Sequence, residues 1–184
     1  MASHSAAGGL SIKGQALRYL AQREHSRAEL ERKLLRAQLR RERRHEQCGD
    51  AGAADDTSTL AQQIAAALDE LTAKGFLSDE RTAAQWLAHK GARYGVKRLR
   101  RDLQAKGLDA ELVSKTVALA RVGEFASALA VWQRKFGQAA QDAKGRGQQL
   151  RFLAGRGYSG DVINQVLRAA DNDESRRVVT NCDD

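Results

Sequence analysis

The residues of this sequence with the clearest chemical potential are the cations concentrated between positions 90 and 108. Seven lysines and arginines stand there against a single acid, Asp102. Ammonium and guanidinium groups bind phosphates and carboxylates. The segment therefore predicts an electrostatic docking surface, although a solvated helix face that only keeps the protein in solution would use the same residues.

A short helix beginning near Gly95 would position these cations. At about 100° per residue, Val96, Leu99 and Leu103 fall on one side, and Lys97, Arg98 and Arg101 fall opposite them and are expected to point outward. Gly107 stands where a helix C-cap is expected.

Basic residues near positions 30 and 150 extend the set, although Glu24, Glu29 and Glu31 also favour ordinary ion pairing near position 30. The candidate contact residues are Lys90, Arg93, Lys97, Arg98, Arg101, Lys106, Arg27, Arg32, Lys33, Arg151 and Arg156.

Groups that could perform catalysis do not converge in this sequence. It contains no phosphate-binding Gly-x-x-x-x-Gly-Lys-Ser/Thr loop, and Asp79-Glu80 suits a helix N-terminus better than acid–base chemistry. The four histidines are scattered, and Cys48 and Cys182 lack a second ligand at metal-binding spacing. We therefore expect no enzymatic activity, no cofactor and no metal site.

Composition favours helices and an anionic partner. The 184 residues include no proline and only 5% aromatics, with alanine and leucine plentiful, which is typical of an all-α protein. The net charge of +8 favours a nucleic acid, a nucleoprotein or an acidic protein surface. No apolar run approaches the roughly 20 residues of a membrane span, and no signal peptide is evident, so we expect a cytoplasmic protein.

Internal periodicity indicates a repeat. Leu103–Leu108 aligns with Leu153–Tyr158 at an offset of 50 residues, and Ser26, Leu30 and Leu34 align with Gly95, Leu99 and Leu103 at an offset of 69. Coincidence is the alternative, because Leu-x-x-Lys-Gly is a common helix ending.

The sequence predicts an all-α fold of three tandem three-helix repeats forming an elongated, curved array. The expected boundaries are a disordered lead at 1–13, repeats at 14–75, 79–121 and 124–170, a polar insertion at about 36–58, and a disordered tail at 171–184.

Four motifs in this order resemble the RecX regulatory protein family. They are Ala16-Leu-x-x-Leu20 with Arg23–Leu34, Gly75-Phe-Leu-Ser-Asp-Glu-Arg81, Gly95–Gly107 and Leu150–Tyr158. The resemblance covers about residues 14–170. The insertion, Ser78 in place of the usual acid, and the polar tail depart from the family pattern.

What the resemblance implies is a cytoplasmic modulator of the RecA recombinase. Members of the family bind the groove of the helical RecA–DNA filament and restrain its growth. They also depress its ATPase, strand-exchange and coprotease activities. For this chain the resemblance implies a negative regulator of RecA, which we expect to be monomeric.

DNA contact is expected to be weak and sequence-tolerant, on single or double strands. Because lysine and arginine side chains would contact phosphates, the affinity for DNA is expected to fall steeply as the salt concentration rises. Trp86, Tyr94 and Trp132 are not expected to form a base-stacking platform, because the tryptophans occupy apolar helix positions. Two rival interpretations stay open: a DNA-binding protein that competes with RecA for DNA, and a helical scaffold for another acidic protein.

Overall fold

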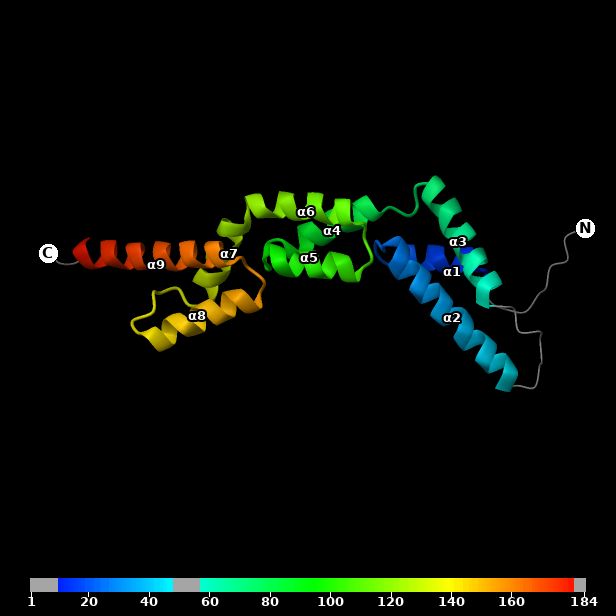
Figure 1. The fold of residues 1–184 in the computed structure, drawn as a ribbon, viewed down its shortest axis with the longest axis horizontal. Coiled ribbons are helices and arrows are strands. Elements are labelled where there is room, and N and C mark those ends of the chain that lie inside the picture. The colour runs from blue at the N-terminus through cyan, green and yellow to red at the C-terminus, as the bar shows by residue number, and fades with distance from the viewer. Residues whose placement is uncertain (1–9, 48–56, 181–184) are drawn as a thin grey trace, which may run out of the picture. The chain divides into compact units, whose positions relative to one another are not determined.

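Residues 10–47 and 57–180 are described by the computed structural model of the chain, and within these ranges it consists of nine α-helices without a β-strand (Figure 1). This confirms the predicted all-α fold; the elongated, curved shape stays a prediction. The chain divides into two compact units, Met1–Thr82 and Ala83–Asp184, each of which is described by itself.

The first unit contains α1 (Ile12–Leu20), α2 (Arg27–Gln47) and α3 (Thr57–Ala73), which pack on one another (Figure 1). Leucines at helical spacing supply its core, because they fall on the inner faces of α2 and α3. The buried members of this core are Ala16, Leu30, Leu34, Leu60, Ile64, Leu68, Leu71 and Leu77.

Polar contacts fix the start of α2. Ser26 is buried, and its Oγ accepts a hydrogen bond from the backbone N–H of Glu29 at 3.2 Å, which caps the helix N-terminus. The Asp79 carboxylate accepts another from the N–H of Arg27 at 2.8 Å. At the far end of α3, Lys13 and Lys74 both donate to Glu70 and hold the pKa of its carboxyl at about 2.

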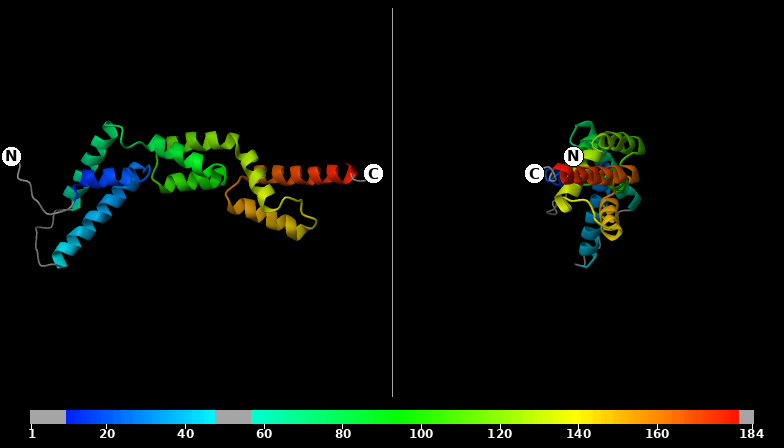
Figure 2. Two further views of the ribbon diagram at one scale, coloured as in Figure 1. Left: turned by 180° about the vertical axis from the view of Figure 1, so that it is seen from behind. Right: turned by 90° about the vertical axis from the view of Figure 1, so that its left-hand side faces the viewer.

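The second unit begins inside α4 (Asp79–Lys90) and continues through five more helices. They are α5 (Val96–Ala105), α6 (Ala110–Val122), α7 (Glu124–Lys135), α8 (Ala143–Gly155) and α9 (Gly160–Thr180). Helices α5 and α6 lie side by side in both long views, and α7 packs on α9 (Figures 1 and 2). One apolar cluster belongs to α4–α6 and a second to α7–α9, so each helix triplet has its own core.

A shared glycine ending marks all three triplets. Gly75, Gly107 and Gly157 adopt positive φ, which glycine tolerates without strain. In each case the residue after the glycine donates its N–H to the backbone carbonyl of the leucine four residues before the glycine, at 2.9 to 3.3 Å. The helix ending predicted at Gly107 is therefore confirmed and recurs at the repeat offset of 50 residues.

The helices extend beyond the predicted boundaries. Helix α1 begins at Ile12, α2 continues to Gln47, and α3 begins at Thr57, so only 48–56 of the predicted insertion lies outside the described residues. Helix α9 continues to Thr180, which corrects the predicted disordered tail as far as that residue. No glycine or proline follows Ala170 to end the helix, and Asp171 pairs with Arg146 at 2.7 Å.

The part of the predicted lead at 1–9, the residues 181–184 and both cysteines lie outside the described residues. Among the helices that the structure describes, none combines the length and apolar character needed to cross a membrane.

Candidate functional site

Helix α5 carries Lys97, Arg98, Arg100 and Arg101 of the basic segment, while Lys90 ends α4 and Arg93 and Lys106 lie in the flanking turns. Val96, Leu99 and Leu103 are buried in the core of α4–α6, while Lys97, Arg100 and Arg101 are exposed. A short amphipathic helix thus presents Lys97 and Arg101 away from its three apolar anchors, with Arg100 at the edge of the buried side.

Arg98, the third cation expected to point outward, is half-buried, and its side chain is 36% exposed. Its Nε atom is buried and makes no hydrogen bond, lying 3.9 Å from the Asp102 carboxylate. Its guanidinium lies 4.0 Å from the centre of the Tyr94 ring. Tyr94 belongs to the turn before α5, and the α8–α9 turn also approaches Arg98, since a Cβ on Gly157 would lie 2.5 Å from the Arg98 Cβ.

Trp86 and Tyr94 gather four of the predicted cations around their rings. The Lys106 Nζ lies 4.3 Å from the Trp86 ring centre, and the Lys90 Nζ lies between the rings, 5.4 Å from Trp86 and 5.5 Å from Tyr94. Arg98 and Arg156 lie 4.0 and 5.8 Å from Tyr94. We call Trp86, Lys90, Tyr94, Arg98, Lys106 and Arg156 the cation–aromatic cluster.

Both tryptophans pack at apolar positions, as expected. Trp132 is a core residue that donates its indole N–H to Gln149 at 3.0 Å, and Trp86 packs against the α4–α6 core. Trp86 and Tyr94, however, are interleaved with cations at distances where the ring quadrupole attracts them. Because the protein's own cations lie over these rings, the rings order the charged groups and are not free platforms for bases.

Two glycines bring Arg156 next to α5. The N–H of Gly95 donates to the carbonyl of Arg156 at 3.1 Å, and the N–H of Lys97 donates to the carbonyl of Gly157 at 3.0 Å. A Cβ atom on Gly95 would lie 2.3 Å from the backbone of Gly157 and Tyr158. The α8–α9 turn therefore contacts the start of α5 backbone to backbone.

Glu124, which the sequence analysis missed, completes this junction. It is 3% exposed, and its Oε1 accepts hydrogen bonds from the N–H groups of Val96 and Ser159, both at 3.1 Å. Its Oε2 accepts one from the Ser159 hydroxyl at 3.2 Å. One carboxylate thus satisfies free amides at the starts of both α5 and α9, where negative charge is favourable.

Tyr158 fixes the same junction from inside. Its hydroxyl lies 3.0 Å from the Ser127 Oγ, which donates to the Gly91 carbonyl at 2.9 Å. Burial raises the pKa of the Tyr158 hydroxyl, so the group stays protonated and able to donate. The cation–aromatic cluster therefore rests on a rigid, hydrogen-bonded junction between two helix triplets.

Comparison with known proteins explains the triplets. A model of the RecX third three-helix domain matches residues 123–167, and one of the second three-helix domain matches residues 78–117. "Regulatory protein RecX" of Leptothrix cholodnii is 42% identical over 164 residues, which cover 89% of this chain and 92% of that protein. The chain belongs to the RecX family.

Further comparisons agree with this assignment. The RecX protein of Herminiimonas arsenicoxydans is 38% identical over 165 residues, covering 90% of this chain and 96% of its own. The crystal structure of RecX from Lactobacillus salivarius has a TM-score of 0.63 at 16% identity, covering 87% of this chain and 94% of that chain. The latter shows the fold, and the relatives identify a RecX-type regulatory protein.

The cation–aromatic cluster and Glu124 lie where the second and third three-helix domains of the RecX family meet. Of the remaining candidates in this unit, Arg93 is exposed and its carbonyl accepts a hydrogen bond from the Arg156 guanidinium at 3.3 Å. Arg151 is exposed on α8 and has no ring or ion-pair contact with the cluster among the described residues.

The three candidates of the first unit are held by local contacts. Arg27 pairs with Asp69 at 2.7 Å, Arg32 donates to the Ala28 carbonyl at 3.0 Å, and the Lys33 Nζ lies 5.1 Å from the Tyr19 ring centre.

His25 is buried in the first unit. Burial, with Arg23 and Lys33 nearby, lowers its pKa even though Glu29 opposes this effect. Within the described ranges, no group of three or more histidine, cysteine or acidic side chains is placed to hold a metal ion.

Proposed function

We propose that this RecX family protein is a negative regulator of the RecA recombinase. It would bind in the groove of the RecA–ssDNA filament and inhibit filament extension, ATP hydrolysis, strand exchange and coprotease activity. We further propose that it acts in the cytoplasm as a monomer. Membership of the RecX family supports the regulatory role, and the net charge of +8 suits a nucleoprotein partner.

The observation that carries the proposal is the cation–aromatic cluster. Its four cations are ordered by two rings and rest on the junction at Glu124, so they lose little conformational freedom when they meet an anion. A RecA–DNA filament offers both carboxylates and phosphates. Exposed Lys97, Arg100 and Arg101 on α5 would extend the same electrostatic contact.

The proposed mechanism is steric and electrostatic. By bridging successive RecA subunits, the protein would hinder the subunit rearrangements that accompany ATP turnover. By occupying the groove, it would exclude the second duplex and the repressor substrate. No chemistry on a covalent bond is required of this chain.

A second candidate function is competition with RecA for DNA. The exposed cations of α5 favour it, because each cation placed on a phosphate releases a counterion whatever the base sequence. A competitor must coat the DNA to act, whereas a filament regulator acts on few subunits.

The test is RecA's ssDNA-dependent ATP hydrolysis during titration with this protein at low and moderate salt. Inhibition well below one copy per RecA, at concentrations too low to coat the DNA, supports filament regulation. Inhibition that begins only when the protein saturates the DNA, and that is lost with added salt, identifies a competitor instead.

A further inference from the structure

The distal half of α2 carries a second cationic surface that the proposed function does not use. Residues 36–44 include five arginines, and four of them are exposed. We call Arg36, Arg40, Arg43 and Arg44 the arginine face. Among the described residues, none of these four has a hydrogen bond or ion pair.

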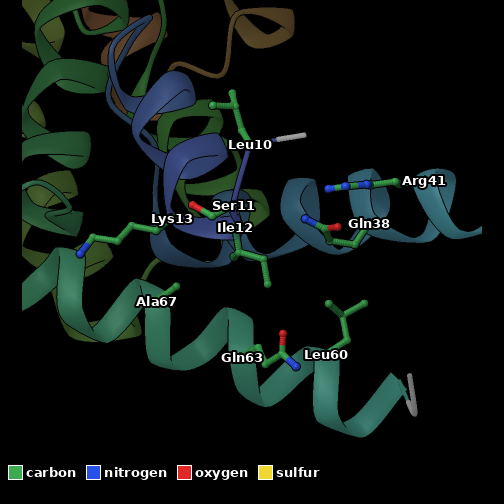
Figure 3. A pocket seen from close by; sticks show the side chains of 9 residues that line it. All are labelled: Leu10, Ser11, Ile12, Lys13, Gln38, Arg41, Leu60, Gln63 and Ala67. Atoms are coloured by element: carbon green, nitrogen blue, oxygen red, sulfur yellow. The ribbon is translucent and has the colours of Figure 1, made fainter. Parts of the chain in front are cut away.

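The arginine face lies opposite the packed side of α2. Leu30 and Leu34 are buried against α1 and α3. Further along, Gln38 and Arg41 line a hollow together with residues of α1 and α3 (Figure 3). Positions 36, 40, 43 and 44 fall within about 100° of one another and point away from that side.

The fold has no evident use for these arginines. They make no contact with the core, and like charges three or four residues apart on a helix destabilise it by a few tenths of a kcal/mol per pair. The four side chains span eight residues of regular helix, or about 12 Å. A ligand with regularly spaced negative charges would attract the four arginines and offset their mutual repulsion.

The chemistry of the face selects among anionic partners. A protein partner is disfavoured, because protein interfaces are anchored by apolar or aromatic side chains, and the neighbouring Leu35 and Leu39 are half-buried. Single-stranded nucleic acid is disfavoured, because the face has no ring on which a base could stack. Duplex DNA fits, because its grooves admit an α-helix and its phosphates bind arginine.

We propose that the arginine face of α2 binds the phosphate backbone of duplex DNA without reading its sequence. It is a site separate from the cation–aromatic cluster, formed by the first unit alone. The inference does not rest on the proposed regulation of RecA, because it is tested with DNA in the absence of RecA.

The experiment compares the full-length protein with the variant R36Q/R40Q/R43Q/R44Q. Glutamine keeps the helix propensity and removes the charge. The matched control is R121Q/R134Q/K135Q/R168Q, which removes four exposed cations from the second unit and has the same net charge. Binding to a mixed-sequence duplex and to an oligothymidine of equal length is measured by fluorescence anisotropy across a salt series, and circular dichroism checks the helix content.

For the duplex, the slope of log affinity against log salt should become shallower by about 3–4 in the arginine-face variant. Between about 50 and 200 mM salt, the wild-type affinity should therefore fall about 100-fold more than that of the variant. The control should keep the wild-type slope, and the oligothymidine should be much less affected. The single variant R40Q should lower the slope by about 0.9.

Three results would overturn the proposal. One is a duplex slope that the arginine-face variant leaves unchanged. Another is an equally shallower slope in the control variant, which would show that the effect comes from the net charge of the protein and not from this face. The third is an equal loss of slope with the oligothymidine, which would show that the face does not prefer duplex DNA. Because the single variant removes only one exposed side chain, it keeps the test decisive even if the quadruple variant folds poorly.

Discussion

The Oε1 atom of Glu124 lies 3.1 Å from the backbone nitrogen of Ser159 and accepts its hydrogen bond at the start of α9. The same oxygen accepts the N–H of Val96 at the start of α5. A single buried carboxylate thus joins the second and third three-helix domains by capping one helix from each. The domains are held in the orientation that assembles the cation–aromatic cluster.

Glu124→Ala should destabilise the second unit by about 2–4 kcal/mol, because it leaves two buried amides and the Ser159 hydroxyl without an acceptor. Glu124→Gln should cost less, because its carbonyl can still accept from one amide. Urea denaturation followed by circular dichroism measures both. Equal stability of Glu124→Ala and the wild type would contradict the assigned role.

Gly95→Ala should destabilise the protein by about 2–3 kcal/mol, because the new methyl group would meet backbone atoms of Gly157 and Tyr158 at 2.3 Å. The matched control is Gly155→Ala in α8, where a Cβ meets nothing within 4 Å. This change should stabilise the helix by about 0.5–1 kcal/mol. Thermal melts give both values, and a neutral Gly95→Ala would show that the α5 start can move away from the turn.

Stability should fall as the pH drops below the ordinary histidine pKa of about 6.5, through His25. Burial lowers the pKa of this side chain in the folded state, so the unfolded chain binds a proton that the folded chain resists. The contribution of neutral His25 to the free energy of unfolding is therefore complete above about pH 6.5. It is lost as the pH falls from there to the lowered pKa of the folded state. Melting temperatures measured from neutral to mildly acidic pH should fall less steeply in His25→Leu, and parallel curves would exclude His25 as the cause.

Tyr94→Leu should weaken inhibition of RecA about 10-fold, because Arg98 loses the ring that lies 4.0 Å from it and Arg156 keeps only its contact with Phe152 at 4.8 Å. Tyr94→Phe is the control, since it keeps the ring face and should stay close to the wild type. The concentration of half-maximal inhibition of RecA's ATPase gives the comparison. If the Tyr94→Leu variant inhibits RecA as well as the wild type does, the ordering of cations by this ring does not contribute to inhibition.

Helix existence and repeat spacing could be predicted because they depend on local patterns. The spacing of Val96, Leu99 and Leu103 was sufficient to predict α5 and its buried side, and Gly107 was sufficient to predict its end. The length of α2 was underestimated because its apolar pattern stops after Leu39, whereas the helix itself continues to Gln47.

The site itself depended on tertiary contacts that no local pattern encodes. Glu124 acquires its partners only when residues 28 and 35 positions away fold against it. Arg98 is half-buried beside Tyr94, and Arg156 reaches Tyr94 from another domain. The sequence therefore indicated which cations to consider, but the structure was needed to group four of them around two rings.

The most direct test of the central claim observes RecA filaments growing on single-stranded DNA with this protein present far below one copy per RecA subunit. The wild type should halt extension. The cluster variant K90Q/K106Q/R156Q should allow growth near the rate without inhibitor, while the charge-matched R121Q/R134Q/K135Q should still halt it. Filament growth unaffected by the wild type, or arrested equally by the cluster variant, would contradict the account.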